Sequence, residues 1–341
     1  MKNFHTIIIG AGPGGLTCAT LLAKQGHNVL VLEKNQRIGP KICGGGVTWS
    51  GLTQHLPESL LEKSFHEQFI FSGWQQVKIS SPQPIISTVS REKLGQCMLK
   101  QAIAAGTQIK TGTLVRKITS HKIITANGEE FGYDFLVGAD GSSSLVRRFL
   151  KIGTRRSGTG INLEVKGDFD RMEWHLNTEL LGSGYAWIFP HKDHASIGAY
   201  AYSQAIKPAT LLKNFNQWAQ KRGINLDKLR PKAALINFDY RGWRFNNIFL
   251  VGDAAGLASG YTGEGIFPAI ISGETVARCI MDPEYDITKL KRLIRRHQAH
   301  SLFVRLTSSN RLLCKIVTET LIAALKTKII HFSALEMGAK E

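Results

Sequence analysis

The fold is decided by the stretch Thr6-Ile7-Ile8-Ile9-Gly10-Ala11-Gly12-Pro13-Gly14-Gly15. Its apolar half predicts a buried strand, its glycines predict a tight turn, and residues 16–24 predict a helix that ends before Gly26. A second apolar run, Val29–Leu32, leads directly into an acidic residue, Glu33. A strand, a glycine turn, a helix, a second strand and a terminal acid follow one another in this order in dinucleotide-binding folds.

Each residue of this pattern has a separate expected task. Gly10 permits the turn, Gly12 lets a pyrophosphate approach the backbone, and Gly15 allows close packing of helix on strand. The helix N-terminus attracts phosphate through its free N–H groups and its dipole. The Glu33 carboxylate is expected to bind a ribose and would repel a 2′-phosphate, so the site favours FAD or NAD over NADP. A glycine turn that only packs a helix on a strand is the alternative interpretation.

The composition is that of an ordinary globular protein, with 341 residues, of which 43% are hydrophobic and 20% charged. This length accommodates one large α/β domain that carries a second, smaller one. The five cysteines are widely spaced, odd in number and without a CxxC pair, so we expect free thiols in a reducing compartment and no metal site. Because the amino-terminal apolar run is a short strand rather than a secretory signal, we expect a cytoplasmic protein.

The positive charge is concentrated near the carboxyl end. The formal net charge is +17, and residues 286–330 contain ten Lys or Arg against two acidic residues. Such a region suits an anionic partner: the inner face of a membrane, a pyrophosphate-bearing substrate or an acidic carrier protein. Solvated helix faces are the alternative explanation. Nucleic acid is not expected, because Phe303 is the one aromatic residue of this region. The apolar segment 312–325 contains Lys315 and Glu319 and is shorter than the roughly 20 residues that span a bilayer.

Apolar periodicity outlines the remaining elements. A helix is expected over 91–105, with Leu94, Met98, Leu99 and Ile103 on one face, and another over 209–222. Strands are expected near 114–118, 122–124, 135–137, 161–165, 185–189 and 195–200. From about residue 270 onward the chain is expected to be helical. The last strong helix has one apolar side formed by Leu313, Ile316, Val317, Thr320, Leu321 and Ala324.

Two further motifs follow the first in the chain, Gly138-Ala-Asp140-Gly141-Ser142 and Gly252-Asp253-Ala-Ala-Gly256. Together the three motifs resemble the FAD-dependent oxidoreductases of the para-hydroxybenzoate hydroxylase fold. The resemblance implies that Gly252 and Asp253 contact the ribityl and pyrophosphate part of FAD, that Asp140 lies near the pyrophosphate, and that Arg91 lies near the diphosphate. The FAD-binding residues expected on this basis are Gly10, Gly12, Pro13, Gly14, Gly15, Glu33, Lys34, Cys43, Gly44, Arg91, Val115, Asp140, Gly252, Asp253, Gly263, Gly265 and Ile266.

The same resemblance implies the fold class and the domain organisation. We expect an α/β fold in which a Rossmann-like FAD-binding domain carries an inserted antiparallel-sheet substrate domain and a helical C-terminus. The FAD-binding domain would comprise residues 1–48, 91–156 and 241–280, and the substrate domain residues 49–90 and 157–240. Residues 281–341 would form the basic helical C-terminal region.

Two shorter motifs narrow the group. Pro40-Lys-Ile-Cys43-Gly44-Gly45 resembles the PxxCGG motif of the geranylgeranyl reductases, and Tyr185-Ala-Trp187-Ile-Phe189-Pro190 resembles their YxWxFP motif. The resemblance covers the chain up to about residue 280 and implies reduction of carbon–carbon double bonds in an isoprenoid or other lipid-like substrate. Tyr200 replaces a glycine of the relatives, and the carboxyl-terminal part is short, which leaves the substrate open.

The chemistry implied is hydride transfer from reduced FAD within a dry, apolar slot. Residues 260–266 would place free N–H groups at the flavin N1 and O2 edge, where negative charge develops on reduction. Tyr185, Trp187 and Phe189 alternate along one strand and therefore share a face that could line the slot. Trp49 and Tyr261 are expected in the same wall. Ordinary core aromatics are the alternative reading.

Cys43, Tyr185 and Trp187 are the candidate catalytic residues. The thiol of Cys43 lies in a flexible glycine run and could approach the flavin, although a buried inert cysteine is the alternative. His191 and His194 are not assigned a role, because turn histidines are usually only solvated. The electron donor is left open between NAD(P)H bound transiently, since there is no second GxGxxG, and a ferredoxin-type carrier docked on the basic region.

Two other classes of protein share these features. A flavin monooxygenase would share the three FAD motifs, and a flavin halogenase has a WxWxIP motif similar to residues 185–190, with Trp where Tyr185 stands. A non-catalytic flavin-binding protein that associates with anionic membranes is the second alternative. Oxygen-dependent turnover would distinguish the monooxygenase from the reductase, and salt-sensitive liposome binding without turnover would indicate the non-catalytic protein.

Overall fold

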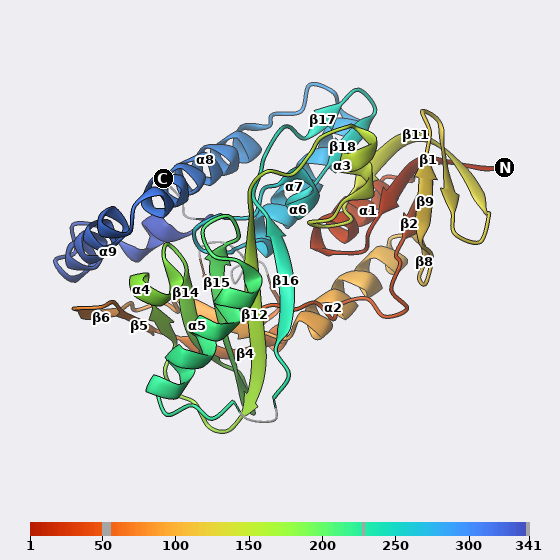
Figure 1. The fold of residues 1–341 in the computed structure, drawn as a ribbon. Helices are drawn as coiled ribbons and strands as arrows, with labels where there is room; N and C mark the ends of the chain where they lie inside the picture. Colours follow the sequence, from red (N-terminus) through yellow and green to blue (C-terminus); the bar gives the residue numbers. More distant parts are fainter. Residues whose placement is uncertain (50–55, 227–228, 339–341) are drawn as a thin grey trace.

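The glycine stretch folds into β1 (Lys2–Ile9), α1 (Pro13–Lys24) and β2 (Val29–Leu32), as its sequence predicts. The structure is a computed structural model that describes residues 1–49, 56–226 and 229–338 (Figure 1). β1 lies between β2 and β11 (Glu130–Gly138), and both pairings are parallel. Ile7 and Ile8 are both fully buried, which is typical of a parallel strand covered on both faces.

This first sheet has the strand order β17-β18-β11-β1-β2-β8, and β9 and β10 extend it as an antiparallel flap beside β11. Its remaining strands are β8 (Gln108–Lys110), β9 (Val115–Ile118), β10 (Lys122–Thr125), β17 (Arg244–Phe245) and β18 (Ile248–Leu250). Helices α1 and α7 (Ile266–Met281) pack so closely that a Cβ at Gly273 would overlap the carbonyl oxygen of Gly14. The first sheet and its helices therefore form a dinucleotide-binding layer.

A second sheet joins two separate stretches of the chain in the order β16-β12-β15-β14-β13-β5-β6. Its strands are β5 (Glu67–Phe71), β6 (Gln76–Ser80), β12 (Ser157–Lys166), β13 (Glu173–His175), β14 (Tyr185–Pro190), β15 (His194–Tyr202) and β16 (Lys232–Asn237). All its pairings are antiparallel except the one between β13 and β5. A small third sheet contains β3 (Gly46–Thr48), β7 (Ile86–Val89) and β4 (Leu61–Phe65).

The other helices connect and cover these sheets. They are η2 (Glu58–Leu60), α2 (Arg91–Ala104), α3 (Leu145–Phe149), α4 (Thr178–Leu181), α5 (Pro208–Lys221), α6 (Gly252–Ala255), α8 (Thr288–Ser309), α9 (Arg311–Lys326) and η3 (Phe332–Leu335). Figure 1 shows α8 and α9 in blue, running from the first sheet across to the edge of the second. Helix α9 contacts β6 and α4. No helix in the described ranges is long and apolar enough to cross a membrane.

Two sequence expectations about helix faces are wrong. In α2, Leu94 and Ala102 are fully buried, but Ile103 is 56% exposed. In α9, the buried side carries Cys314, Thr318, Ile322 and Leu325, whereas Leu313 and Ile316 of the predicted face are 40% and 52% exposed. The reason is that α9 presents its other side to β6 and α4, a contact that periodicity alone does not reveal.

Candidate active site

One cavity brings together residues that lie far apart in the sequence. We call it the central cavity; it is lined by Gly12–Gly14, by residues 41–48, by Arg91 and by the turn at Gly252 and Asp253. Its other walls come from Trp174, Tyr185, Trp187, Phe189, Tyr200, Ile236, residues 262–267, Phe332, Leu335 and Glu336. The cavity therefore joins the glycine turns of the first sheet to an aromatic face of the second.

The three glycines of the first turn differ in their surroundings. Gly10 has a φ of +103°, and a Cβ there would overlap the backbone of Ala139. A Cβ at Gly15 would overlap the carbonyl oxygen of Gly10, so this glycine keeps α1 close to β1. A Cβ at Gly12, by contrast, would meet no atom within 4 Å. Gly12 is thus the position at which the turn is open, and α1 starts there without a side-chain cap on its N–H groups.

Glu33 is fixed beside this turn. Its Oε2 accepts the Ala11 N–H at 2.9 Å, and its Oε1 accepts both the backbone N–H and the side-chain amide of Asn35, at 2.9 and 2.8 Å. Lys34 is exposed, and Val115 lies in the hydrophobic core of the first sheet. Glu33, Lys34 and Val115 do not line the central cavity, and their contacts with FAD stay predictions.

Arg91 is a cation without protein partners at two of its nitrogen atoms. It begins α2, which Ser90 caps by accepting the Lys93 N–H at 3.3 Å. The Nε and Nη1 atoms of Arg91 are buried and have no hydrogen-bond partner, although the side chain lines the cavity. A buried unpaired guanidinium is costly unless an anion satisfies it. The site therefore calls for a negatively charged group at this point.

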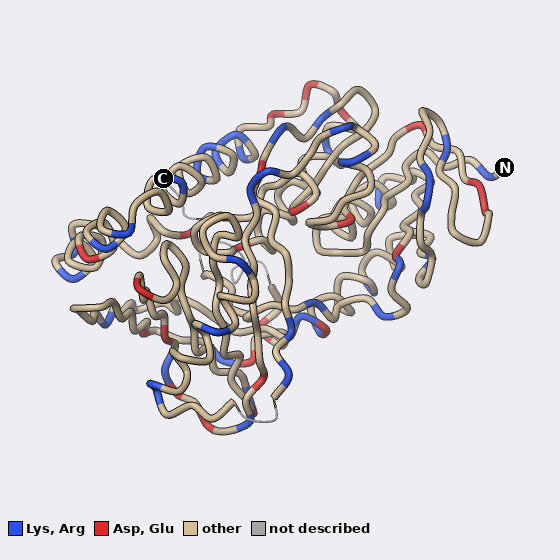
Figure 2. The backbone as a smooth tube through the Cα atoms, in the orientation of Figure 1, with Lys and Arg blue, Asp and Glu red and all other residues tan. Residues whose placement is uncertain are grey.

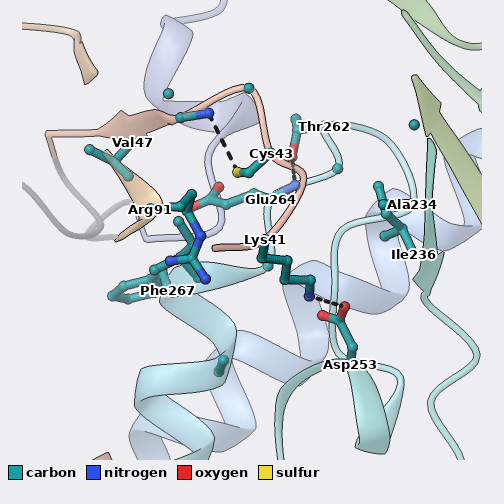
Figure 3. A pocket seen from close by; sticks show the side chains of 18 of the residues that line it. Lys41, Cys43, Val47, Arg91, Ala234, Ile236, Asp253, Thr262, Glu264 and Phe267 are labelled. Carbon is teal, nitrogen blue, oxygen red and sulfur yellow. Dashed lines mark hydrogen bonds and ion pairs between the residues drawn. The ribbon is translucent and has the colours of Figure 1, made fainter. Parts of the chain in front are cut away.

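Asp253 is oriented by groups from three other segments. Lys41 Nζ lies 3.2 Å from its Oδ2, as Figure 3 shows, and the Ser142 hydroxyl donates to the same oxygen at 3.0 Å. The side-chain amide of Asn237 donates to the Asp253 carbonyl oxygen at 2.8 Å. Gly252, with a φ of +53°, makes the turn from β18 into α6 that directs the carboxylate to the cavity.

Asp140 serves locally as a helix cap. Its Oδ2 accepts the N–H groups of Leu145 and Val146 at 2.6 and 3.3 Å, at the start of α3. Burial raises the pKa of the Asp140 carboxyl, against these hydrogen bonds. Gly141 lines the cavity but Asp140 does not, so the predicted position of Asp140 near a pyrophosphate is left as a prediction.

His191 supports the loop that carries Cys43. Its Nε2 lies 3.2 Å from the Gly44 carbonyl oxygen and its Nδ1 lies 2.7 Å from Oε2 of Glu62. Because Gly45 has a φ of +76° and a Cβ there would overlap the His191 ring, a glycine is required at position 45. The Cys43 thiol accepts the Gly45 N–H at 3.4 Å and lines the cavity. The sequence did not indicate this role for His191.

The aromatic wall is continuous. The rings of Tyr185 and Trp187 lie 5.8 Å apart, and those of Trp187 and Phe189 5.9 Å apart. Trp174 continues the wall at 5.4 Å from Tyr185 and 5.5 Å from Phe332, and its buried indole N–H has no partner. Trp174 and Phe332 were missed from the sequence, because neither belongs to a recognisable motif. The Tyr185 hydroxyl donates to the Thr262 carbonyl oxygen, and burial raises the pKa of this phenol well above its ordinary range.

Trp49 and Tyr261 do not belong to this wall. The backbone N–H of Trp49 donates to the Ile85 carbonyl oxygen at 3.0 Å, and the Trp49 side chain does not line the cavity. Tyr261 is buried on the other side of the turn, where its ring packs edge-on against Phe303 at 4.6 Å. Six of the remaining predicted residues line the cavity: Pro13, Gly14, Gly44, Gly263, Gly265 and Ile266. Gly10 and Gly15 do not line it.

Comparisons with known proteins agree with this geometry. Residues 8–43 match the family model of the NAD(P)-binding Rossmann-like domain. The digeranylgeranylglycerophospholipid reductase of Methanothrix thermoacetophila is 25% identical over an alignment of 370 positions, gaps included, that covers 92% of this chain and 91% of that protein. A geranylgeranyl bacteriochlorophyll reductase-like protein of Thermoplasma acidophilum superimposes with a TM-score of 0.80 at 21% identity, over 99% of this chain and 96% of that one.

By sequence and by fold the chain is similar to the geranylgeranyl reductases, and it is an FAD-dependent oxidoreductase. The fold is shared with other flavoproteins as well. PqsL, a probable FAD-dependent monooxygenase of Pseudomonas aeruginosa, superimposes with a TM-score of 0.65 at 18% identity, over 96% of this chain and 98% of that one. The fold expected from the sequence, a Rossmann-like domain with a second sheet and a helical C-terminus, is confirmed.

FAD fits the central cavity. The unpaired nitrogen atoms of Arg91 and the open space at Gly12 meet the requirements of a diphosphate beside the N-terminus of α1. Asp253 offers an oriented carboxylate for hydroxyl groups, and the aromatic wall offers an apolar surface beyond it. Within the described ranges, no group of three or more His, Cys, Asp or Glu side chains is arranged to hold a metal ion.

Proposed function

We propose that this flavoprotein reduces carbon–carbon double bonds of an isoprenoid or another lipid-like substrate. The observation that carries the proposal is the aromatic wall of Tyr185, Trp187 and Phe189, which faces the same cavity as the dinucleotide-binding turns. A flat, apolar wall of this kind suits an extended hydrocarbon chain, and it excludes water from the reacting carbon atoms. Reduced FAD, when bound, would supply the hydride.

Most polar groups around the wall are hydrogen-bonded within the protein, which favours a substrate with few polar atoms. Trp187 satisfies its indole N–H on Ser196 at 3.0 Å, and Tyr185 satisfies its hydroxyl on Thr262. The Trp174 N–H is left as an unused donor. It would hydrogen-bond to an isolated oxygen atom of the substrate.

We also propose that electrons reach the site from NAD(P)H bound transiently or from an acidic, ferredoxin-type carrier docked on the basic region. Figure 2 shows Lys and Arg positions, in blue on the backbone tube, along α8 and α9. The two donors are distinguished by anaerobic reduction of the FAD-loaded protein. Reduction by NADH or NADPH alone supports the first donor, whereas reduction only by a reduced ferredoxin supports the second.

The turn between α8 and α9 has the properties of a membrane contact. Leu302, Leu306, Leu312, Leu313 and Ile316 are between 40% and 67% exposed there, beside the exposed Arg305 and Arg311. Exposed leucines flanked by arginines favour the interface of an anionic bilayer. We propose that this surface delivers the lipid-like substrate.

Vesicle binding tests this contact. We expect salt-sensitive sedimentation with vesicles that contain phosphatidylglycerol, and a clear loss of binding in the double variant Leu312→Ser, Ile316→Ser. Leu114→Ser is the matched control, because Leu114 is 47% exposed near the β9–β10 flap. Equal binding by both variants and the wild type would refute the contact.

The reductase activity is tested by anaerobic single turnover. The dithionite-reduced protein is mixed with geranylgeranyl diphosphate or a geranylgeranylated glycerophospholipid, and the product is analysed by mass spectrometry. We expect a mass increase of two hydrogen atoms for each double bond reduced, together with reoxidation of the flavin. A product that forms only with oxygen would favour the monooxygenase or halogenase alternative, and vesicle binding without any turnover would favour the non-catalytic alternative.

A further inference from the structure

The glycine turn that closes the cavity carries a carboxyl group, that of Glu264. Its neighbours Gly263 and Gly265 line the same cavity, and a Cβ at Gly263 would lie 3.3 Å from the Tyr185 hydroxyl. Glu264 itself is half-buried and lines the cavity, as Figure 3 shows. The carboxyl group therefore faces the space beside the aromatic wall.

The hydrogen bonds of Glu264 hold it in place without an ion pair. Its Oε2 accepts the Met337 N–H at 3.0 Å, and its Oε1 lies 3.5 Å from the Thr48 hydroxyl. The charged groups that act on it are Glu336, in the segment after η3, and Arg296 on α8, which donates to the Glu336 carbonyl oxygen at 2.7 Å. Burial, reinforced by the charge of Glu336, raises the pKa of the Glu264 carboxyl to about 7.

Three of the other acidic or proton-bearing groups of the cavity, those of Asp253, Tyr185 and Tyr200, are engaged by protein partners. The Asp253 carboxylate is paired with Lys41, and Arg91 is a permanent cation. The hydroxyl groups of Tyr185 and Tyr200 donate to the carbonyl oxygen atoms of Thr262 and Gly260. Cys43 lines the same cavity, and its thiol accepts the Gly45 N–H at 3.4 Å.

We propose that Glu264 is a catalytic residue, the acid that protonates the substrate carbon during reduction of the double bond. This proposal rests on the proposed function. The alkene accepts a hydride at one carbon from reduced FAD and the Glu264 proton at the other. Its π bond is replaced by two C–H bonds, the alkene gains two electrons and the flavin loses two, and the Glu264 carboxylate regains a proton from water.

The first test measures turnover. In Glu264→Gln, we expect uptake of FAD and its reduction by dithionite to be retained, and substrate-dependent flavin reoxidation to be at least about 100-fold slower, as for loss of a general acid. The rate in the wild type should fall as pH rises through about 7, where Glu264 ionises. Glu264→Asp should recover part of the rate together with a pH dependence. The matched control is Glu274→Gln, which removes a carboxylate from α7 that pairs with Lys289 outside the cavity.

The second test measures stability and needs neither substrate nor FAD. Because the folded-state pKa of Glu264 is raised, protonated Glu264 stabilises the fold relative to the ionised form. That contribution is complete below the unfolded pKa of 4.5 and is lost as pH rises through about 7. The melting temperature of the wild type, relative to Glu264→Gln, should therefore fall between pH 5 and pH 8. Relative to Glu274→Gln it should stay constant.

The outcomes separate the two claims. Wild-type turnover in Glu264→Gln, or a constant stability difference between pH 5 and pH 8, overturns the role of Glu264. Equal loss of turnover in the Gln and Asp variants with no pH dependence shows a structural role and overturns it as well. A wild type that reduces no alkene refutes the proposed function, and the stability profile then reports on the Glu264 proton by itself.

Discussion

Gly12 and Gly15 lie three residues apart, but a side chain at each would have a different effect. The Cβ of residue 12 would enter open space at the cavity, whereas that of residue 15 would overlap the Gly10 carbonyl oxygen. We expect Gly12→Val to fold and melt like the wild type without FAD but to take up no FAD. Gly15→Val should be destabilised with or without it. Absorbance of bound flavin and thermal melts check both; a Gly12→Val protein with a full complement of FAD would contradict the assignment.

Arg91 gives a second prediction at this scale. Because two of its nitrogen atoms have no protein partner, Arg91→Gln should leave the stability of the FAD-free protein unchanged or slightly higher. Its affinity for FAD should fall roughly 10- to 100-fold, the loss expected for a hydrogen bond to a charged group. Calorimetric titration with FAD measures the change. Arg37→Gln is the control, since Arg37 pairs with Glu92 on the surface and is 74% exposed; equal affinities in the two variants would refute the role of Arg91.

At the scale of elements, α9 shows where sequence patterns fail. Its apolar residues form two helical stripes, and the predicted stripe through Leu313 and Ile316 is the more exposed one. Ile322→Ala should cost about 2–5 kcal/mol of unfolding free energy because Ile322 is fully buried. Ile316→Ala should change it by no more than about 0.5 kcal/mol. Urea denaturation of both variants measures this contrast, and the reverse order would show that the face is misassigned.

The elements that the sequence did predict are those whose signals are local. The turn at Gly10–Gly15, the strand that presents Tyr185, Trp187 and Phe189, and the Gly252–Asp253 turn each carry their geometry in consecutive residues. Three residues reach the site only through tertiary contacts. Trp174 lies on β13, and Phe332 follows α9. His191 lies beneath the loop that carries Cys43. No periodicity marks such residues, so sequence reasoning could not find them. Tyr261 was misplaced for the converse reason, because its motif lines the cavity while its ring turns away to Phe303.

At the scale of the whole molecule, the central cavity is bounded by both large sheets, by α2 and by η3. A ligand that fills it should stabilise all these parts together, by an amount that grows with ligand concentration. We expect FAD to raise the melting temperature of the wild type in a single transition, by an amount equivalent to about 2.7 kcal/mol at 100 times its dissociation constant. Gly12→Val should show no such increase, and an equal increase in both proteins would contradict binding at this cavity.

Three distant turns and one aromatic strand are predicted to form a single site for FAD. A crystal structure of the protein with FAD bound tests this prediction most directly. We predict the pyrophosphate at Gly12 and the N-terminus of α1, within reach of Arg91, the ribityl chain at Asp253, and the isoalloxazine ring facing Tyr185, Trp187 and Phe189. A flavin bound elsewhere, or one whose ring lies on the side of Tyr261 away from this wall, would contradict the account.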